Sequence, residues 1–236
     1  MSSHQSNKLS PQKIAILGSA FDPPHYAHVA LAYLTLKTQD IQQIWFCPSP
    51  DRWDKKCKAP FATRCLWVQK LCEILESHQL PVFICDSEGN PPRPYRGTYV
   101  FLKELQRQWP QHQFSLIVGS DAFEFMPQWR DATTQKINGP KLIAKTTIFV
   151  AQRGHKTDEQ EKPKAAANIQ YLDSFAQHEE LLFKLTSCFS SEINELSSTL
   201  IRQKIAKNKN SELNFCFSEI KKLIVESGIY CTDSNT

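Results

Sequence analysis

The segment from Ile14 to His28 constrains the fold of this chain more than any other (IAILGSAFDPPHYAH). It starts as an apolar run typical of a β-strand, passes through a turn rich in small residues and Pro, and ends where a helical pattern begins. A strand, a turn and a helix N-terminus in this order favour anion binding, because backbone N–H groups and the helix dipole attract negative charge. His25 and His28 lie on one helical face, so both can reach the same bound group. The segment therefore predicts phosphate chemistry.

Composition limits the classes of protein and partner. The 236 residues, of which 41% are hydrophobic, suffice for one α/β domain with an appendage. A net charge of +4 is too mild for a nucleic-acid-binding protein, but it suits a polyphosphate pocket. The sequence contains no apolar run long enough to span a membrane and no signal-peptide core. Its eight cysteines show neither CxxC nor zinc-finger spacing. We therefore expect a cytoplasmic protein with reduced thiols, no membrane partner and no metal site of its own.

Strand-like and helix-like segments alternate along the chain, which predicts a parallel sheet covered by helices. The expected fold is α/β: a Rossmann-like, doubly wound α/β/α sandwich with a small C-terminal helical subdomain. Its strands are expected at residues 13–18, 43–48, 82–86, 114–119, 147–152 and 169–173. Its helices are expected at residues 28–38, 62–77, 99–109 and 122–128.

The same patterns suggest how the chain is divided. We expect a flexible N-terminal tail at 1–12 and a Rossmann-like core at 13–185. Within the core, the charged segment 153–168 lacks periodicity and is expected to be a mobile loop. Residues 186–236 form the C-terminal helical part, with helices expected at 200–207 and 217–227.

The N-terminal segment resembles a known signature. Gly18-Ser-Ala-Phe-Asp-Pro-Pro-His25-Tyr-Ala-His28 is similar to the GxFxPxHxGH motif of the nucleotidyltransferase superfamily. Ala27 stands where many members of that superfamily have Gly. If the backbone there had positive φ, or packed against a phosphate, the added methyl group would interfere. Some relatives carry larger residues at this point, so we expect Ala27 to be tolerated.

Further segments narrow the resemblance to the nicotinate/nicotinamide mononucleotide adenylyltransferases. They are a lysine-containing loop over 51–64, Tyr95-Arg-Gly-Thr98, Gly119-Ser-Asp121 followed by Trp129, Leu196-Ser-Ser-Thr-Leu-Ile-Arg202, and the closing Ser227-Gly-Ile-Tyr230. These segments are spread along nearly the whole chain. Together with the N-terminal motif they identify the sequence as a suspected member of that family.

The resemblance implies a reaction and a set of site residues. The 5′-phosphate of a pyridine mononucleotide would attack the α-phosphate of ATP, giving deamido-NAD or NAD and pyrophosphate in NAD biosynthesis, with Mg²⁺ arriving with ATP. The implied catalytic residues are His25, His28 and Arg202. The implied ATP-binding residues are Gly18, Ser19, Ala20, Phe21, Gly119, Asp121, Ser198 and Thr199. The implied mononucleotide-binding residues are Trp53, Lys55, Tyr95, Thr98 and Trp129.

Each motif also has a plainer interpretation. Paired histidines can be surface groups of a helix, and Ser198 with Thr199 can be a simple N-cap followed by a surface arginine. Aromatic residues are more often packed in a core than exposed in a site. The joint occurrence of the motifs favours the functional interpretation.

Three questions stay open at this point. The chain could be another nucleotidyltransferase, of the phosphopantetheine or polyol-phosphate type, or a non-catalytic nucleotide-binding module on the same fold. The sequence does not decide between nicotinate and nicotinamide mononucleotide, and it slightly favours an enzyme that accepts both. The sequence does not reveal the oligomeric state, and a homo-oligomer is one of the alternatives.

Overall fold

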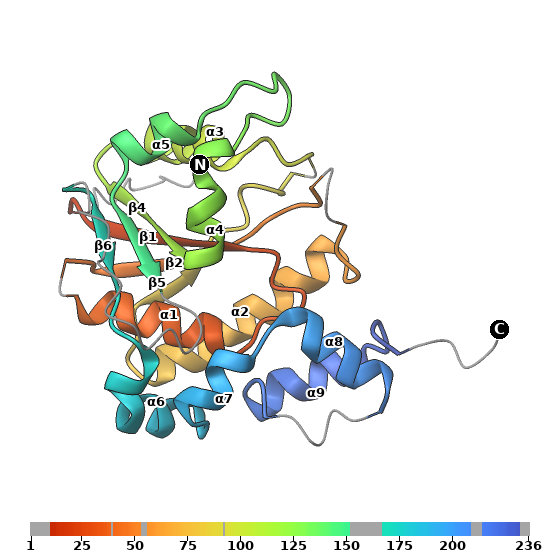
Figure 1. The fold of residues 1–236 in the computed structure, drawn as a ribbon. Helices are drawn as coiled ribbons and strands as arrows, with labels where there is room; N and C mark the ends of the chain where they lie inside the picture. Colours follow the sequence, from red (N-terminus) through yellow and green to blue (C-terminus); the bar gives the residue numbers. More distant parts are fainter. Residues whose placement is uncertain are drawn as a thin grey trace, which may run out of the picture.

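A six-stranded parallel sheet forms the centre of the molecule (Figure 1). The computed structural model describes residues 10–38, 40–52, 56–91, 93–151, 167–208 and 214–231. The strand order is β3-β2-β1-β4-β5-β6, so the winding of the chain reverses between β1 and β4. The strands are β1 (Lys13–Ser19), β2 (Gln43–Pro48), β3 (Val82–Ile84), β4 (Gln113–Gly119), β5 (Ile148–Ala151) and β6 (Ile169–Tyr171). This is the predicted doubly wound fold.

Strand β1 is buried on both faces, which explains its uninterrupted apolar run. Ala15 and Leu17 pack into one hydrophobic cluster, and Ile14 and Ile16 pack into another on the opposite face. None of these four side chains is more than 3% exposed. Because β1 pairs with β2 on one side and with β4 on the other, it is the strand beside the point where the winding reverses.

Helices cover both faces of the sheet (Figure 1). The cluster that contains Ala15 and Leu17 packs against α1 (Tyr26–Lys37) and α2 (Phe61–Ser77). The cluster on the other face packs against α3 (Thr98–Gln108), the 3-10 turn at Met126–Gln128 that follows α4 (Ser120–Phe125), and α5 (Gly139–Lys145). The two layers make the predicted sandwich.

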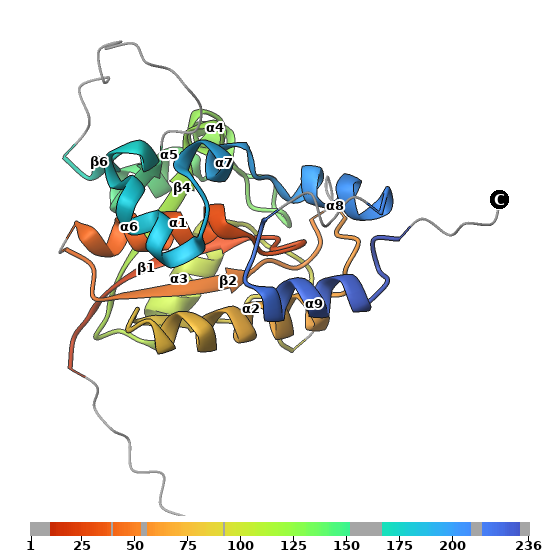
Figure 2. The same cartoon turned by 90° about the horizontal axis from the view of Figure 1, so that it is seen from below.

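The C-terminal part consists of short helices. They are a 3-10 turn at Phe175–His178, α6 (Glu179–Thr186), α7 (Ser190–Glu195), α8 (Ser198–Ala206) and α9 (Ser218–Glu226). In Figure 2, α9 runs alongside α2, and α8 lies beyond the arrowhead end of β2. The arrowhead marks the carboxyl end of β2, so α8 lies at the carboxyl edge of the sheet. The domain boundary predicted after residue 185 falls at the end of α6.

Several predicted boundaries need correction. Helix α1 begins at Tyr26 rather than at residue 28, and the strand expected to reach residue 86 ends at Ile84. The helix expected over 122–128 is a short α-helix followed by a 3-10 turn that contains Pro127, which has no N–H to donate. Helices α5, α6 and α7 were not predicted, because each is only six to eight residues long. The expected mobile loop lies outside the described residues except for 167–168.

Candidate active site

A cavity of about 380 Å³ opens at the carboxyl ends of β1 and β4, where the strand order reverses. Open α/β sheets bind ligands at such a switch point. Residues from five separate segments line the cavity. Those among them that were predicted from the sequence are Gly18, Ser19, Ala20, His25, His28, Tyr95, Thr98, Gly119, Asp121, Trp129, Ser198 and Thr199. The structure thus brings most of the predicted site together.

The two histidines lie against each other at the start of α1. Their ring centroids are 3.9 Å apart, and both side chains are almost fully buried. The backbone N–H of His25 donates to Nδ1 of His28 at 3.2 Å. Because Nδ1 accepts this bond, the proton of the neutral His28 ring is on Nε2, which lies 3.2 Å from Oγ of Ser19. His28 is thereby oriented to present an N–H group at the floor of the cavity.

Phe21 does not line the cavity, contrary to its predicted role in ATP binding. Its side chain is fully buried, with its ring centroid 4.7 Å from that of His28 and 5.7 Å from that of Phe46. The residue has a φ of 49°, which turns the chain and directs the ring into the core. The side chain of Phe21 therefore packs against the ring of His28 and does not line the cavity.

Ala27 poses no obstacle. It is the second residue of α1, has ordinary right-handed helical backbone, and is 2% exposed within the core cluster. Gly18, in contrast, faces open space: a Cβ built there meets no atom within 4 Å, and its φ is not positive. Within this motif, Gly18 is thus the position where the missing side chain leaves space open in the cavity.

Asp22 is a connecting residue that the sequence did not single out. Its carboxylate is 4% exposed and accepts bonds from the backbone N–H groups of Lys58 (2.8 Å) and Ala59 (3.1 Å) and from the hydroxyl of Tyr230 (2.5 Å). Burial and this bond to Asp22 raise the pKa of Tyr230. One carboxylate thus ties the N-terminal motif to the segment before α2 and to the end of the chain.

Arg64 also connects separate segments of the chain, at the ends of β1 and β2 and before α2. Its guanidinium group is fully buried and donates to the carbonyl groups of Ala20 (2.5 Å), Ser49 (2.8 Å) and Ala59 (3.1 Å). These carbonyl groups follow β1, follow β2 and precede α2. Arg64 closed the lysine-containing motif in the sequence, but only the structure shows that it fixes the sheet edge under the cavity.

The start of α8 forms the opposite wall. The N-cap is Ser197, whose hydroxyl accepts from the N–H of Leu200, so the plainer interpretation of Ser198 and Thr199 as the cap is wrong by one residue. The hydroxyl of Ser198 instead donates to the carbonyl of Pro23 at 3.0 Å. This bond joins α8 directly to the turn of the N-terminal motif.

Arg202 stands behind this wall. It donates to the carbonyl of Asp22 at 2.6 Å and to the hydroxyl of Thr199 at 3.1 Å. Its side chain is 22% exposed, so it is not a simple surface arginine. Thr199 lines the cavity and Arg202 supports it from the side.

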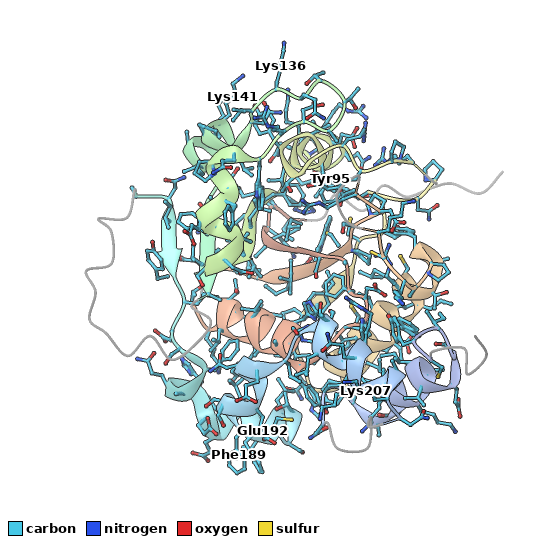
Figure 3. The ribbon with its side chains drawn as sticks, turned by 45° about the vertical axis from the view of Figure 1, so that its right-hand side comes forward. Tyr95, Lys136, Lys141, Phe189, Glu192 and Lys207 are labelled. Atoms are coloured by element: carbon cyan, nitrogen blue, oxygen red, sulfur yellow. The ribbon has the colours of Figure 1, made fainter. Side chains whose placement is uncertain are left out.

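The remaining wall comes from the segments before α3 and after β4. Tyr95 is labelled in Figure 3. Its hydroxyl lies 3.3 Å from that of Thr98, and the guanidinium carbon of Arg52 lies 5.5 Å from the centroid of its ring. Trp129 lines the cavity and packs partly against the core. The predicted residues Trp53 and Lys55 lie outside the described residues. This wall is aromatic and carries positive charge.

Glu88 also lines this side and was not predicted. It is 7% exposed, and burial raises the pKa of its carboxyl group to about 7. It belongs to no recognised motif and to no helix or strand, so no local sequence signal marks it. A buried acid in a cavity is a candidate functional group.

The described ranges contain no group of three or more His, Cys, Asp or Glu side chains placed to hold a metal ion. None of their helices is both long and apolar enough to span a bilayer.

The chain is similar to known proteins along most of its length. The cytidylyltransferase-like family model matches residues 16–204. A "probable nicotinate-nucleotide adenylyltransferase" of Anaeromyxobacter sp. (strain K) is 32% identical over 146 residues, which are 61% of this chain and 73% of that protein. A protein of the same description from Bacillus cereus (strain G9842) is 31% identical over 50% of this chain, and the match spans 61% of that protein.

Solved structures share the fold. The nicotinic acid mononucleotide adenylyltransferase of Plasmodium falciparum, complexed with NaAD, superposes with a TM-score of 0.70 at 22% identity. That match covers 93% of this chain and 97% of the other. The family match includes the histidine pair, the cavity and the start of α8. The chain therefore belongs to the cytidylyltransferase-like family of nucleotidyltransferases, with the nicotinate-nucleotide adenylyltransferases among its relatives.

Proposed function

We propose that this protein transfers the adenylyl group of ATP to nicotinate mononucleotide, nicotinamide mononucleotide or both, giving deamido-NAD or NAD and pyrophosphate. The observation that carries the proposal is the arrangement of one cavity. The His25–His28 pair at the start of α1 faces the start of α8, and an aromatic wall adjoins both. The similarity to proteins described as probable nicotinate-nucleotide adenylyltransferases supports the same assignment.

The reaction needs positioning and charge neutralisation. An oxygen of the mononucleotide 5′-phosphate forms a bond to the α-phosphorus of ATP. The bond from that phosphorus to the bridging oxygen breaks, and pyrophosphate leaves with the electron pair. The substrate phosphate is itself the nucleophile, so no covalent enzyme intermediate is required. Alignment of the two phosphates and stabilisation of the growing negative charge then account for catalysis.

The residues on the ATP side can supply that stabilisation. His28 presents Nε2–H toward the α-phosphate, with His25 beside it, and the N-terminus of α1 adds backbone N–H groups. Ser198 and Thr199 at the start of α8 are proposed to bind the β- and γ-phosphates, with the charge of Arg202 directly behind them. Asp121 is proposed to accept from the ribose hydroxyls.

The pyridine mononucleotide is proposed to bind on the aromatic side, between Tyr95, Thr98 and Trp129. Flat aromatic faces suit its positively charged ring. The proposed contacts of Trp53 and Lys55 concern residues outside the described ranges. The metal ion in this proposal is part of the substrate, MgATP. The phosphate oxygens would hold Mg²⁺, which retains several waters in such complexes.

The proposal is tested by product formation. Wild-type protein incubated with MgATP and each mononucleotide in turn should yield NAD or deamido-NAD, resolved by chromatography. The variant His28→Ala should lower kcat at least a hundredfold while the protein stays folded, because it removes the donor at the α-phosphate. The matched control is His78→Ala at the exposed C-cap of α2, which should retain wild-type turnover. A folded wild-type protein that forms neither product, or near-wild-type turnover of the His28 variant, would refute the proposal.

A further inference from the structure

Glu88 is held firmly in the wall of the cavity. It lies in the turn after β3, where the N–H groups of Gly89 and Asn90 both donate to the carbonyl of Asp86 at 3.0 Å. Gly89 packs against the ring of Phe61 so closely that a Cβ would lie 2.5 Å from its Cζ atom. The turn therefore cannot move toward α2, and Glu88 is fixed at the cavity.

One oxygen of this carboxyl group lacks a partner. Oε1 of Glu88 is inaccessible and makes no hydrogen bond to any residue that the structure describes. Buried polar atoms are nearly always paired, and leaving one unpaired is destabilising. Burial also raises the pKa of this group to about 7, so near neutral pH much of it carries an unbalanced charge. This cost calls for a compensating ligand.

The arginines closest to Glu88 are paired elsewhere. Arg93 donates through Nε to the backbone carbonyl of Glu88 at 2.9 Å and through Nη2 to the carbonyl of Ser87. It also lies 3.3 Å from the carboxylate of Glu104, with which Arg96 forms an ion pair as well. None of these bonds reaches the carboxyl group of Glu88. Both arginines weakly favour its charged form without pairing with it.

The surroundings of Glu88 suit a flat cation. Tyr95 and Trp129 line the same cavity, and the planar guanidinium group of Arg52 already lies near the face of the Tyr95 ring. Aromatic faces attract cations, and a carboxylate beside them adds a full negative charge. The pyridinium ring of an oxidised pyridine mononucleotide is planar and positively charged. A ring of the same shape without that charge would leave Glu88 unbalanced.

We propose that Glu88 is a specificity-determining residue, whose carboxylate selects a mononucleotide with a positively charged pyridinium ring over one with an uncharged ring of the same shape. This inference rests on the proposed function, since it assigns the substrate class of that same pocket. The selection concerns the pyridinium charge, which the nicotinamide and the nicotinate forms both carry, and not the substituent on the ring.

The test compares nicotinamide mononucleotide with its reduced form, whose dihydropyridine ring is uncharged. For the wild-type protein, kcat/KM should favour the oxidised form at least tenfold. Glu88→Gln should reduce this preference at least tenfold, whereas Glu88→Asp, which keeps the charge, should retain most of it. The control Glu73→Gln removes the same charge from an exposed position on α2 and should leave the preference unchanged.

The outcomes separate the two proposals. A wild-type protein that uses both forms equally, or a Glu88→Gln variant with the wild-type preference, would overturn the role of Glu88 and leave the adenylyl transfer intact. If wild-type protein forms no dinucleotide at all, the proposed function fails. Calorimetric binding of the two mononucleotides then tests Glu88 directly, with the same preferences expected in Kd and equal Kd values overturning the role.

Discussion

Asp22 and Glu88 are two buried carboxyl groups with opposite surroundings, and Glu88 alone lines the cavity. Asp22 accepts three hydrogen bonds from segments far apart in the sequence and has Arg202 nearby at 3.7 Å. Glu88 is almost as buried, yet its Oε1 has no partner among the described residues. The contrast indicates that the charge of Asp22 is met by the protein itself, whereas Glu88 keeps an electrostatic demand that a ligand in the cavity can meet.

The largest expected effect is on stability and concerns Asp22. Asp22→Asn replaces an acceptor with an amide N–H that faces backbone donors, so it should lower the free energy of unfolding by about 3 kcal/mol. Denaturant titration measures this loss. Asp51→Asn is the matched control, because Asp51 is 53% exposed and lies 3.8 Å from Arg64. It should cost less than about 1 kcal/mol. Equal losses in the two variants would remove the distinction drawn for Asp22.

A smaller effect, on activity alone, is expected at Gly18. Gly18→Val should raise KM for ATP about tenfold, which is about 1.4 kcal/mol, with an unchanged Tm. The reason is that the new side chain enters open cavity and not packed core. Gly228→Ala should instead lower the Tm and leave the KM for ATP unchanged. The φ of +66° at this position strains a residue with a side chain, but the position lies away from the cavity. If Gly18→Val instead destabilised the protein and left KM unchanged, the open floor of the site would be disproved.

A further effect, seen only when the pH is varied, is the pH dependence of stability due to Glu88. Its folded-state pKa of about 7 lies above the ordinary value of 4.5, so the folded protein binds this proton more tightly than the unfolded chain. The stabilisation is complete below about pH 4.5 and is lost as the pH rises through 7. Glu88→Gln should therefore gain stability relative to wild type between pH 5 and pH 8, by about 2.5 kcal/mol. If the difference in unfolding free energy between Glu88→Gln and the wild type were the same at pH 5 and at pH 8, the result would contradict the burial of this charge.

The sequence predicted the parts of this molecule that depend on local order. The apolar run of β1, the turn and the two histidines occur within fifteen residues, so their joint position at a helix N-terminus could be inferred. The doubly wound topology followed from the alternation of strands and helices and is confirmed. The role of Phe21 could not be inferred, because a positive φ at one residue decides whether its ring faces the ligand or the core.

What the sequence could not show depends on distant contacts. Asp22 meets Tyr230 across 208 residues of chain, and Ser198 meets Pro23 across 175. Both pairs lie in motifs that were recognised, but nothing in the motifs states that they touch. Glu88 differs again, since its importance lies in a missing partner, which only three-dimensional packing reveals.

The central claim is that the α-phosphate of ATP is the group transferred in this cavity. ATP labelled at either the α- or the γ-phosphorus, supplied with Mg²⁺ and nicotinamide or nicotinate mononucleotide, tests this most directly. We expect the α-label in the dinucleotide and the γ-label in pyrophosphate, with both signals lost in His28→Ala. The γ-label in the nucleotide product, or in inorganic phosphate, would contradict the account.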